Sequence, residues 1–412
     1  MRGLVEQRRR VALIVALGAS VSGAGCRIGD LGSGPTTYSI PRAVTTPAPA
    51  AGNLRLTAVA SGFFHACGLD AGGRAWCWGD NQYRQAGMSD AGQPCDGTST
   101  CALRPVAVET ELRFAAVTAG VTHSCALTAD GAAYCWGGGY GPGGAGFLGN
   151  GERARSARPV AVAGGLRFKS LSAGGLVTCG IAADDRGYCW GSGRYVGAGG
   201  TADALVPTEV AGGHRFVSLG AGTAHGCGVA TTGAAYCWGA NQHGQLGTGR
   251  LGTQLPEGAG TAPRRVQSER AFRSVTVGGD HACGLTAEGD VLCWGRNHVG
   301  QTGAGAAGEP QPAPRPVAGA GAYVQVAAGL VHTCALRPGG VAVCWGGNWF
   351  GGLGDGISTA ANTGAERPTP TPVRTDLTFV QIAPGGSHTC ALAGSGRAWC
   401  WGDRARGQLG DG

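Results

Sequence analysis

Cysteine is the residue type in this chain whose spacing points most directly to chemistry. The 412-residue sequence holds 17 cysteines, and fourteen of them form pairs whose members stand ten positions apart. These seven pairs are Cys67 with Cys77, Cys125 with Cys135, Cys179 with Cys189, Cys227 with Cys237, Cys283 with Cys293, Cys334 with Cys344, and Cys390 with Cys400. Thiols at this density form disulfides or bind zinc, so the two chemistries must be told apart.

The local pattern around each pair favours a disulfide. In the second copy, residues 124–127 are predicted to form a strand, residues 129–131 a turn and residues 132–136 the returning strand. This register places Cys125 opposite Cys135 in a non-hydrogen-bonded pair, whose Cα atoms approach to about 4.5 Å. That separation lies within the range of disulfides.

Zinc is the alternative chemistry for the same residues. His123, Cys125 and Cys135 are expected on one face of the hairpin, where they could supply three ligands of a zinc site. The regular pairing in an exported chain favours disulfides instead. Cys95 and Cys101 are a further pair, which we expect to staple the loop after the first hairpin.

Histidines accompany the cysteines at a fixed distance. Six of the nine histidines stand two residues before the first cysteine of a pair, and Val177 takes that place in the third copy. They are His65, His123, His225, His281, His332 and His388. Because a catalytic histidine is normally unique in its site, we expect a structural hydrogen bond to backbone within each copy.

Sequence signatures of enzymes and of nucleic-acid binding are missing. The chain contains no Gly-x-Ser-x-Gly, His-Glu-x-x-His or Cys-x-x-Cys motif, and its single lysine, Lys169, does not belong to a P-loop. Carboxylates are few and lie mostly in turns. The net charge of +7 is modest and scattered, which argues against a nucleic-acid partner. We therefore predict a protein that is not an enzyme and has no cofactor or metal.

The cysteine pairs are part of a longer internal repeat. Successive copies begin 48 to 58 residues apart, and Trp-Gly follows the second cysteine in every copy. Each copy also has a Pro/Val segment and a Phe-x-x-Val segment, which gives four strand candidates. Both faces of the cysteine hairpin are apolar, so both should be buried against neighbouring copies. The sequence therefore predicts an all-β fold, a seven-bladed β-propeller with about four antiparallel strands per blade.

The first 26 residues predict export. Arg8, Arg9 and Arg10 precede a short apolar run that ends in small residues, which is typical of a signal peptide and too short for a membrane span. The segment before Cys26 resembles a bacterial lipobox, which implies lipidation of Cys26. We assign residues 1–26 to the signal, 27–52 to a tether or ring-closing segment and 53–412 to the propeller. The protein is expected in the cell envelope or on the outer surface as a lipoprotein, or secreted, with membrane contact through the lipid anchor only.

Several copies carry a recognisable motif after the second cysteine. The fourth copy has it as Ala235-Tyr236-Cys237-Trp238-Gly239, followed by Asn241 and Gln245-Leu246-Gly247. This motif resembles the repeat of the regulator of chromosome condensation family, and the resemblance covers nearly all of residues 40–412. It implies a propeller closed by pairing between the two chain ends. By family analogy it also suggests guanine-nucleotide exchange, although an export signal and paired cysteines describe another compartment.

The variable loops are the candidate binding surface. The long segments 138–151, 247–263, 303–314 and 353–372 occupy corresponding positions of the repeat and should emerge on one face. Aromatic residues in or beside such loops are Tyr140, Phe147, Tyr195, Trp349 and Phe350. They either contact a partner or pin the loops onto the blades.

From this we predict a non-enzymatic scaffold that binds a protein partner through one loop face, with a glycan as the second kind of partner. The alternative is an envelope enzyme that acts on glycan or peptide at the mouth of the central channel.

Overall fold

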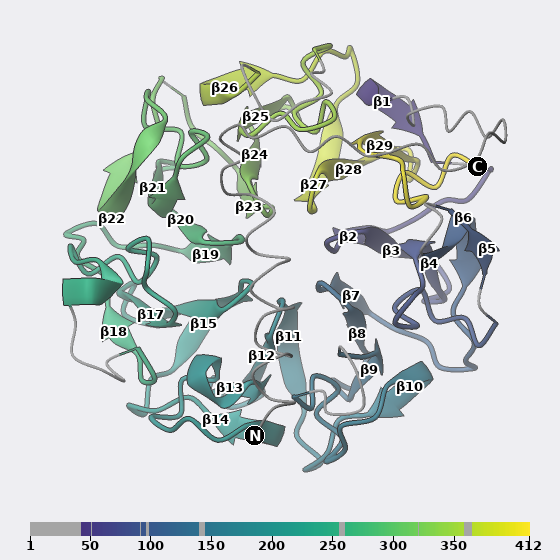
Figure 1. Cartoon of the computed structure of the whole chain (residues 1–412), viewed down its shortest axis with the longest axis horizontal. Coiled ribbons are helices and arrows are strands. Elements are labelled where there is room, and N and C mark those ends of the chain that lie inside the picture. The colour runs from purple at the N-terminus through teal and green to yellow at the C-terminus, as the bar shows by residue number, and fades with distance from the viewer. Residues whose placement is uncertain are drawn as a thin grey trace, which may run out of the picture. The chain divides into compact units, whose positions relative to one another are not determined.

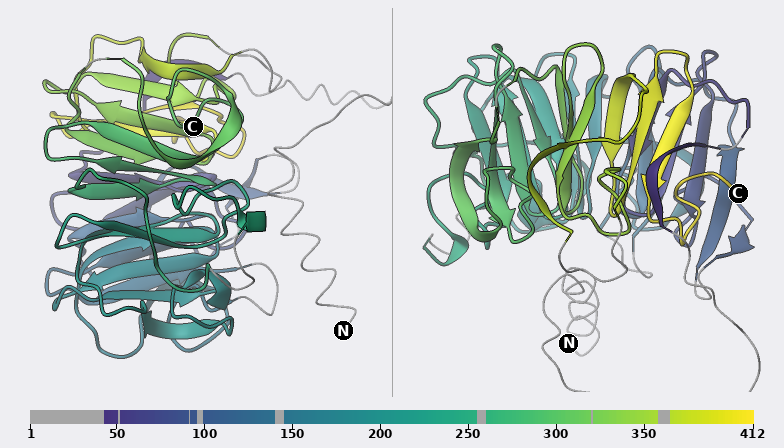
Figure 2. Two further views of the ribbon diagram at one scale, coloured as in Figure 1. Left: turned by 90° about the vertical axis from the view of Figure 1, so that its left-hand side faces the viewer. Right: turned by 90° about the horizontal axis from the view of Figure 1, so that it is seen from above.

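The computed structural model shows a ring of seven β-sheets, which confirms the predicted seven-bladed propeller (Figure 1). It describes residues 43–50, 52–90, 92–95, 99–139, 145–254, 260–319, 321–357 and 365–412. Residues 41–412 form one compact unit. Each blade is an antiparallel meander that starts at the central axis, and the strands run from one face of the ring to the other (Figure 2).

The strands of the first four blades follow the repeat in chain order. Blade 1 contains β2 (Ala58–Ser61), β3 (His65–Leu69), β4 (Ala75–Asp80), β6 (Thr100–Ala107) and the short additional β5 (Gln93–Pro94). Blade 2 contains β7 (Ala116–Ala119), β8 (His123–Leu127), β9 (Ala133–Gly137) and β10 (Ser156–Ala161). Blade 3 contains β11 (Phe168–Ala173), β12 (Val177–Ala182), β13 (Gly187–Gly191) and β14 (Ala204–Glu209). Blade 4 contains β15 (Phe216–Ala221), β16 (His225–Ala230), β17 (Ala235–Gly239) and β18 (Arg264–Arg265).

The remaining three blades complete the ring. Blade 5 contains β19 (Ser274–Val277), β20 (His281–Leu285), β21 (Val291–Asn297) and β22 (Gly308–Pro316). Blade 6 contains β23 (Gln325–Ala328), β24 (His332–Leu336), β25 (Ala342–Gly346) and β26 (Arg367–Pro372). Blade 7 contains β27 (Phe379–Pro384), β28 (His388–Ala393), β29 (Ala398–Gly402) and β1 (Val44–Pro49). Helical structure in the described residues is limited to the short 3-10 turns η1 (Gly193–Tyr195) and η2 (Gly252–Gln254), and none of it is long and apolar enough to cross a membrane.

Every blade is stapled across its two middle strands. In all seven hairpins the paired cysteines are direct cross-strand neighbours, with Cα atoms 4.0 to 4.1 Å apart and sulfurs at bonding distance. The short Cα separation is that of the predicted non-hydrogen-bonded pair. In chain order the pairs are Cys67 with Cys77, Cys125 with Cys135, Cys179 with Cys189, Cys227 with Cys237, Cys283 with Cys293, Cys334 with Cys344, and Cys390 with Cys400.

The eighth predicted pair lies outside this pattern. Cys95 and Cys101 also lie at bonding distance, with a Cα separation of 5.9 Å, and they join the segment after β5 to β6. The pair therefore closes the loop after the first hairpin, in the place where the sequence predicts a staple.

The core is divided into seven hydrophobic clusters, one between each pair of neighbouring blades. Between blades 4 and 5, the cysteine face of one hairpin, with Cys227 and Val229, packs against Trp294 and Phe272 of the next blade. The seven repeat tryptophans are completely buried. Both faces of each hairpin are therefore covered, as the apolar pattern predicts.

The inner edge of most blades is tied to the next blade by side chains. Thr118 accepts a hydrogen bond from the backbone of Ala173 across one interface, and Gln381 of blade 7 makes a bidentate pair with the backbone of Val59. These bonds satisfy backbone groups that an open strand edge would leave unpaired. On the outer edge the strands are rich in proline, as in β22 and β26, which removes backbone donors from the exposed edge.

The ring closes by pairing of its two chain ends in blade 7. Strand β1 pairs antiparallel with β29, which places the first described strand outside the last hairpin. In the other direction, the C-terminal loop packs on blade 1, where the carbonyl of Gln408 accepts a hydrogen bond from Trp78 Nε1 at 3.0 Å. The ring-closing strand lies within segment 27–52, for which a tether was the alternative assignment.

Candidate binding face

The order of strands defines two faces of the ring. The loop face carries the turn between the first and second strands of each blade and the long loop between the third and the outermost strand. The hairpin face carries the short turns between the second and third strands and the connections between blades. Because the four variable segments all join a third strand to an outermost strand, their described parts leave on the loop face, as predicted.

A ring of seven glycines surrounds the channel at the loop face. One glycine follows the innermost strand of every blade: Gly62, Gly120, Gly174, Gly222, Gly278, Gly329 and Gly385. In five of the seven blades the residue after the glycine donates its backbone N–H to the glycine carbonyl of the next blade, as in Phe63 to Gly120 at 3.0 Å and Leu330 to Gly385 at 2.9 Å. A Cβ on Gly329 would lie 2.5 Å from the carbonyl oxygen of Gly385. Only glycine lets the blades approach closely enough for these bonds.

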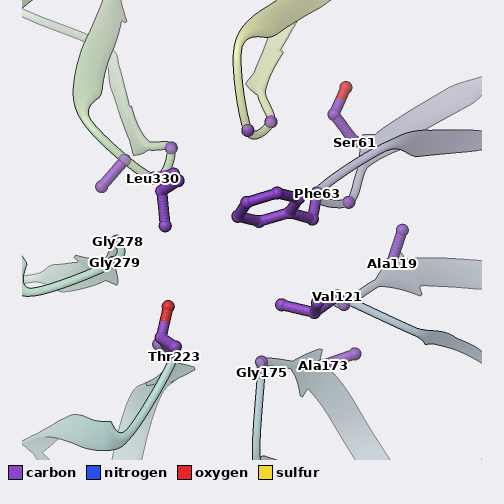
Figure 3. Close-up of a pocket in the computed structure, with 18 of the residues that line it drawn as sticks. Ser61, Phe63, Ala119, Val121, Ala173, Gly175, Thr223, Gly278, Gly279 and Leu330 are labelled. Carbon is purple, nitrogen blue, oxygen red and sulfur yellow. The ribbon is translucent and has the colours of Figure 1, made fainter. Parts of the chain in front are cut away.

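The side chains inside the glycine ring are small or apolar. Phe63, Val121, Leu330 and Thr223 point toward the centre of the channel mouth (Figure 3). The recess has a volume of about 90 Å³, well below the roughly 300 Å³ of a small-molecule site. Its lining contains no titratable side chain within the described part of the chain. This mouth offers an apolar contact surface and no acid–base groups for the alternative of a channel-mouth enzyme.

The six repeat histidines are completely buried between blades. Four of them, His65, His123, His281 and His332, have partners that differ from the prediction, whereas His225 and His388 have no partner at either ring nitrogen among the described residues. His65 Nε2 lies 2.8 Å from Ser124 Oγ, and His332 Nε2 lies 2.9 Å from Thr389 Oγ1, so the partner is a hydroxyl of the next blade rather than backbone of the same blade. Ser124 itself donates to the carbonyl of Gln85, so it accepts from the imidazole. This fixes the neutral Nε2–H tautomer.

Burial holds these histidines neutral. It lowers the pKa of His65, His281 and His388 to about 3 and the pKa of His123, His225 and His332 to about 4, because desolvation disfavours the charged form.

The paired cysteines lie away from the channel mouth and away from solvent. None of the fourteen blade cysteines lines the recess, and each is at most 1% exposed. The sulfurs that a zinc site would need are bonded to each other, and His123 is bound to Thr178. Among the described residues, no group of three or more His, Cys, Asp or Glu side chains is arranged to hold a metal ion.

The predicted aromatic residues have different environments in the structure. Phe147 is buried, its ring stacks on His123 and its carbonyl accepts a hydrogen bond from Trp190, so it pins its loop to the blade. Tyr195 is half-buried against the cluster between blades 3 and 4. Tyr140 lies outside the described residues.

Trp349 and Phe350 lie together in the loop of blade 6, both half-buried. Phe350 has a φ of +55°, which a bulky side chain rarely adopts. The indole nitrogen of Trp349 is buried and has no hydrogen-bond partner among the described residues. Strained backbone and an unsatisfied donor side by side are features that concentrate at functional sites.

Other residues of this face were not singled out from the sequence. Phe63 contacts Phe64 edge-to-face with ring centroids 4.2 Å apart, and the Arg406 guanidinium lies 4.2 Å from the centre of the Phe64 ring. Arg406 is also held by Asp80 at 3.0 Å. The position of Phe63 could have been inferred from the sequence, because it directly follows Gly62, the repeat glycine of the first copy.

A polar cluster lies between the loops of blades 4 and 5 on the same face. Arg296 pairs with Asp280 at 3.2 Å, and both side chains are largely buried. His243 and His298 lie near this pair, and burial lowers the pKa of both histidines. The loop face therefore combines an apolar centre with a partly buried polar border, which is typical of a protein-binding surface.

Comparisons with known proteins agree with the fold. The model of the RCC1-like domain matches residues 18–374, and that of the regulator of chromosome condensation (RCC1) repeat matches residues 379–408. The protein is thus a β-propeller built from sequence repeats. It belongs to the RCC1-like domain family.

Two curated relatives come from Arabidopsis thaliana. The chain is 29% identical over 360 residues to the mitochondrial RCC1 domain-containing protein RUG3, covering 85% of this chain and 66% of that one. It is 31% identical over 149 residues to the ultraviolet-B receptor UVR8, covering 34% of this chain and 31% of the receptor. The matches thus span less than two thirds of the length of these relatives.

Solved structures show the same fold at low identity. Human WBSCR16 matches with a TM-score of 0.72 and 21% identity, covering 88% of this chain and 94% of that one. Yeast RCC1 (Prp20), solved bound to Kap60, matches with a TM-score of 0.69 and 20% identity, covering 95% and 88%.

Proposed function

We propose that this protein is a non-enzymatic, exported propeller that binds a protein partner through its loop face. The observation that carries the proposal is the strained, half-buried pair of Trp349 and Phe350. Aromatic side chains in this state provide large contact area, and they are enriched among the residues that contribute most to protein interfaces. Relatives support a protein partner, since one solved structure of Prp20p from Saccharomyces cerevisiae is described with its binding to Gsp1p and histones.

Rigidity of the frame supports the same proposal. Each blade is held by a disulfide, and backbone bonds around the glycine ring join neighbouring blades. A surface that is already ordered loses less conformational entropy when it binds.

The proposal is tested by substitution of the aromatic pair. The variant Trp349→Ser/Phe350→Gly should lose at least tenfold in the amount of partner captured from envelope extract, and glycine also relieves the positive φ at position 350. Val217→Ser on the opposite face, where Val217 is exposed, is the matched control and should capture as much as the unaltered protein. Equal capture by all three proteins would refute binding at this face.

Export and anchoring belong to the same proposal. We assign lipidation to Cys26, so Cys26→Ala should move the protein from the membrane fraction to the soluble fraction of the envelope. Retention of Cys26→Ala in the membrane fraction would exclude a lipid on this residue.

A further inference from the structure

A second surface lies on the hairpin face, where the ring closes. Two arginine–tryptophan stacks stand there at the same register position of neighbouring blades 1 and 7. The Arg74 guanidinium lies 6.0 Å from the centre of the Trp76 ring, and that of Arg397 lies 5.4 Å from the centre of the Trp399 ring. Both tryptophans are half-buried, in contrast to the seven completely buried repeat tryptophans.

The two stacks flank the hairpin turn of blade 7, with Trp76 against the cluster between blades 7 and 1 and Trp399 against the cluster between blades 6 and 7, and the connection from β1 to β2 contacts that turn. Arg55 donates to the carbonyl of Ser395, two residues before Arg397, at 3.3 Å. Thr57 binds the carbonyl of Leu69, next to Asp70, whose carboxylate accepts a hydrogen bond from Trp76 Nε1 at 2.9 Å. We call the surface formed by Arg55, Arg74, Trp76, Val380, Arg397 and Trp399 the seam patch.

An exposed apolar residue completes the patch. Val380 is 64% exposed, and it lies beside the turn that precedes Arg397, since a Cβ on Gly394 would be 3.8 Å from Val380 Cγ1. An exposed valine on the same face as two half-buried tryptophans adds apolar contact area to this surface.

The charge of the seam patch is positive. Its three guanidinium groups form no ion pair with any carboxylate of the described residues, whereas many other arginines of the chain do. The nearest carboxylate, Asp70, is engaged by Trp76 Nε1 and by the backbone N–H groups of Gly72 and Arg74. Its charge offsets that of one arginine, which leaves a net excess of positive charge.

We infer that the seam patch binds an extended, carboxylate-rich polypeptide segment. Guanidinium groups that lie over tryptophan rings and have no ion-pair partner among the described residues can bind carboxylates in pairs of hydrogen bonds. Val380 and the ring edges take the apolar side chains that alternate with the acids. An acidic glycan fits less well, because the exposed Val380 offers a sugar no hydrogen-bonding group.

The test uses a fluorescein-labelled glutamate-rich peptide and its glutamine counterpart with the full-length protein. Fluorescence anisotropy should show binding of the glutamate peptide, weakened by salt. The variant Arg74→Gln/Arg397→Gln should raise its Kd at least about tenfold, because it removes two charge-assisted hydrogen bonds to the peptide carboxylates.

The control variant Arg265→Gln/Arg315→Gln removes the same charge from exposed positions on the outer strands of blades 4 and 5 and should bind the peptide like the unaltered protein. Equal weakening in both double variants, or equal binding of the glutamine peptide, would overturn the inference, as would a uronate oligosaccharide that binds more tightly than the peptide. Trp349→Ser/Phe350→Gly should bind the peptide normally, which separates this surface from the loop face.

Discussion

The six buried histidines give the protein a dependence on pH. Their native pKa values of about 3 to 4 lie well below the value near 6.5 that histidine has in an unfolded chain. At pH values between the native and the unfolded pKa, the unfolded chain binds more protons than the native protein. The stability of the fold is therefore undiminished above pH 6.5 and falls as the pH decreases toward 4.

Denaturant unfolding between pH 7.5 and pH 4 should show this loss. Each histidine contributes a slope of up to about 1.4 kcal/mol per pH unit in this window. His332→Val removes one such group, and Val177 shows that a blade tolerates valine here. The slope in the variant should be smaller by that amount, and an unchanged slope would show that His332 takes up its proton in the native state.

A comparison of two histidines isolates the bond across the blade interface. His332 is bound to Thr389 of the next blade. His388 has no partner at either ring nitrogen among the described residues, because blade 1 has Ala66 at the position that Thr389 occupies in blade 7. Both substitutions to valine leave a similar void, but only His332→Val breaks a hydrogen bond. It should cost about 1–2 kcal/mol more than His388→Val in unfolding experiments at pH 7.5. Equal costs would mean that the bond to Thr389 contributes nothing to stability.

At the scale of the blade, the turn at the channel mouth tolerates only glycine. Gly329→Ala puts a methyl group 2.5 Å from the Gly385 carbonyl oxygen and 3.0 Å from His332 Cε1. Because backbone on both sides must move, the change should lower the free energy of unfolding by about 1–3 kcal/mol. Gly200→Ala is the control, since nothing lies within 4 Å of its new methyl group. A Gly329→Ala protein as stable as Gly200→Ala would show that the turn accommodates a methyl group.

The disulfides differ in access to solvent. The cysteines of the seven blade pairs are at most 1% exposed, whereas Cys95 is half-buried at the end of β5. Treatment of the native protein with a dilute dithiol, followed by alkylation and mass spectrometry, should label Cys95 and Cys101 first. The other fourteen should react only at the rate of unfolding. Early labelling of a blade pair, such as Cys293 with Cys283, would show that blades open locally.

The hairpin within each blade and the burial of its two faces could be predicted from the sequence, but the individual hydrogen bonds between blades could not. The hairpin register of Cys125 and Cys135 depends on eleven consecutive residues. The bond from His123 to Thr178 joins residues 55 positions apart and forms only when the blades pack. A sequence signal for this bond does exist: in four copies a serine or threonine stands directly before the first cysteine of the pair, at Ser124, Thr178, Thr333 and Thr389.

The candidate surfaces show the same limit. The sequence predicts Phe147 as a loop aromatic because it stands in the variable segment 138–151, but its carbonyl accepts a hydrogen bond from Trp190 of the next blade. The seam patch brings Trp76 and Arg397 onto one surface through ring closure, and no local pattern announces that arrangement.

At the scale of the whole ring, β1 is the strand that ties the N-terminal end of the propeller to its last blade. Removal of residues 1–49 deletes β1 and leaves β29 without its partner, whereas removal of residues 1–40 leaves β1 in place. The longer truncation should therefore melt at least about 10 °C lower and aggregate through its open edge. Calorimetry of the two truncated proteins measures their melting temperatures, and light scattering measures their aggregation. Equal melting temperatures would show that β1 is dispensable.

The direction of β1 has a consequence for how the ring meets its surroundings. Strand β29 runs toward the loop face, and β1 is antiparallel to it, so the chain enters the ring from the loop-face side. Thr45 of β1 lies next to Gly351, since a Cβ on that glycine would be 3.0 Å from Thr45 Cα. A partner bound at Trp349 and Phe350 would therefore lie next to the strand that closes the ring.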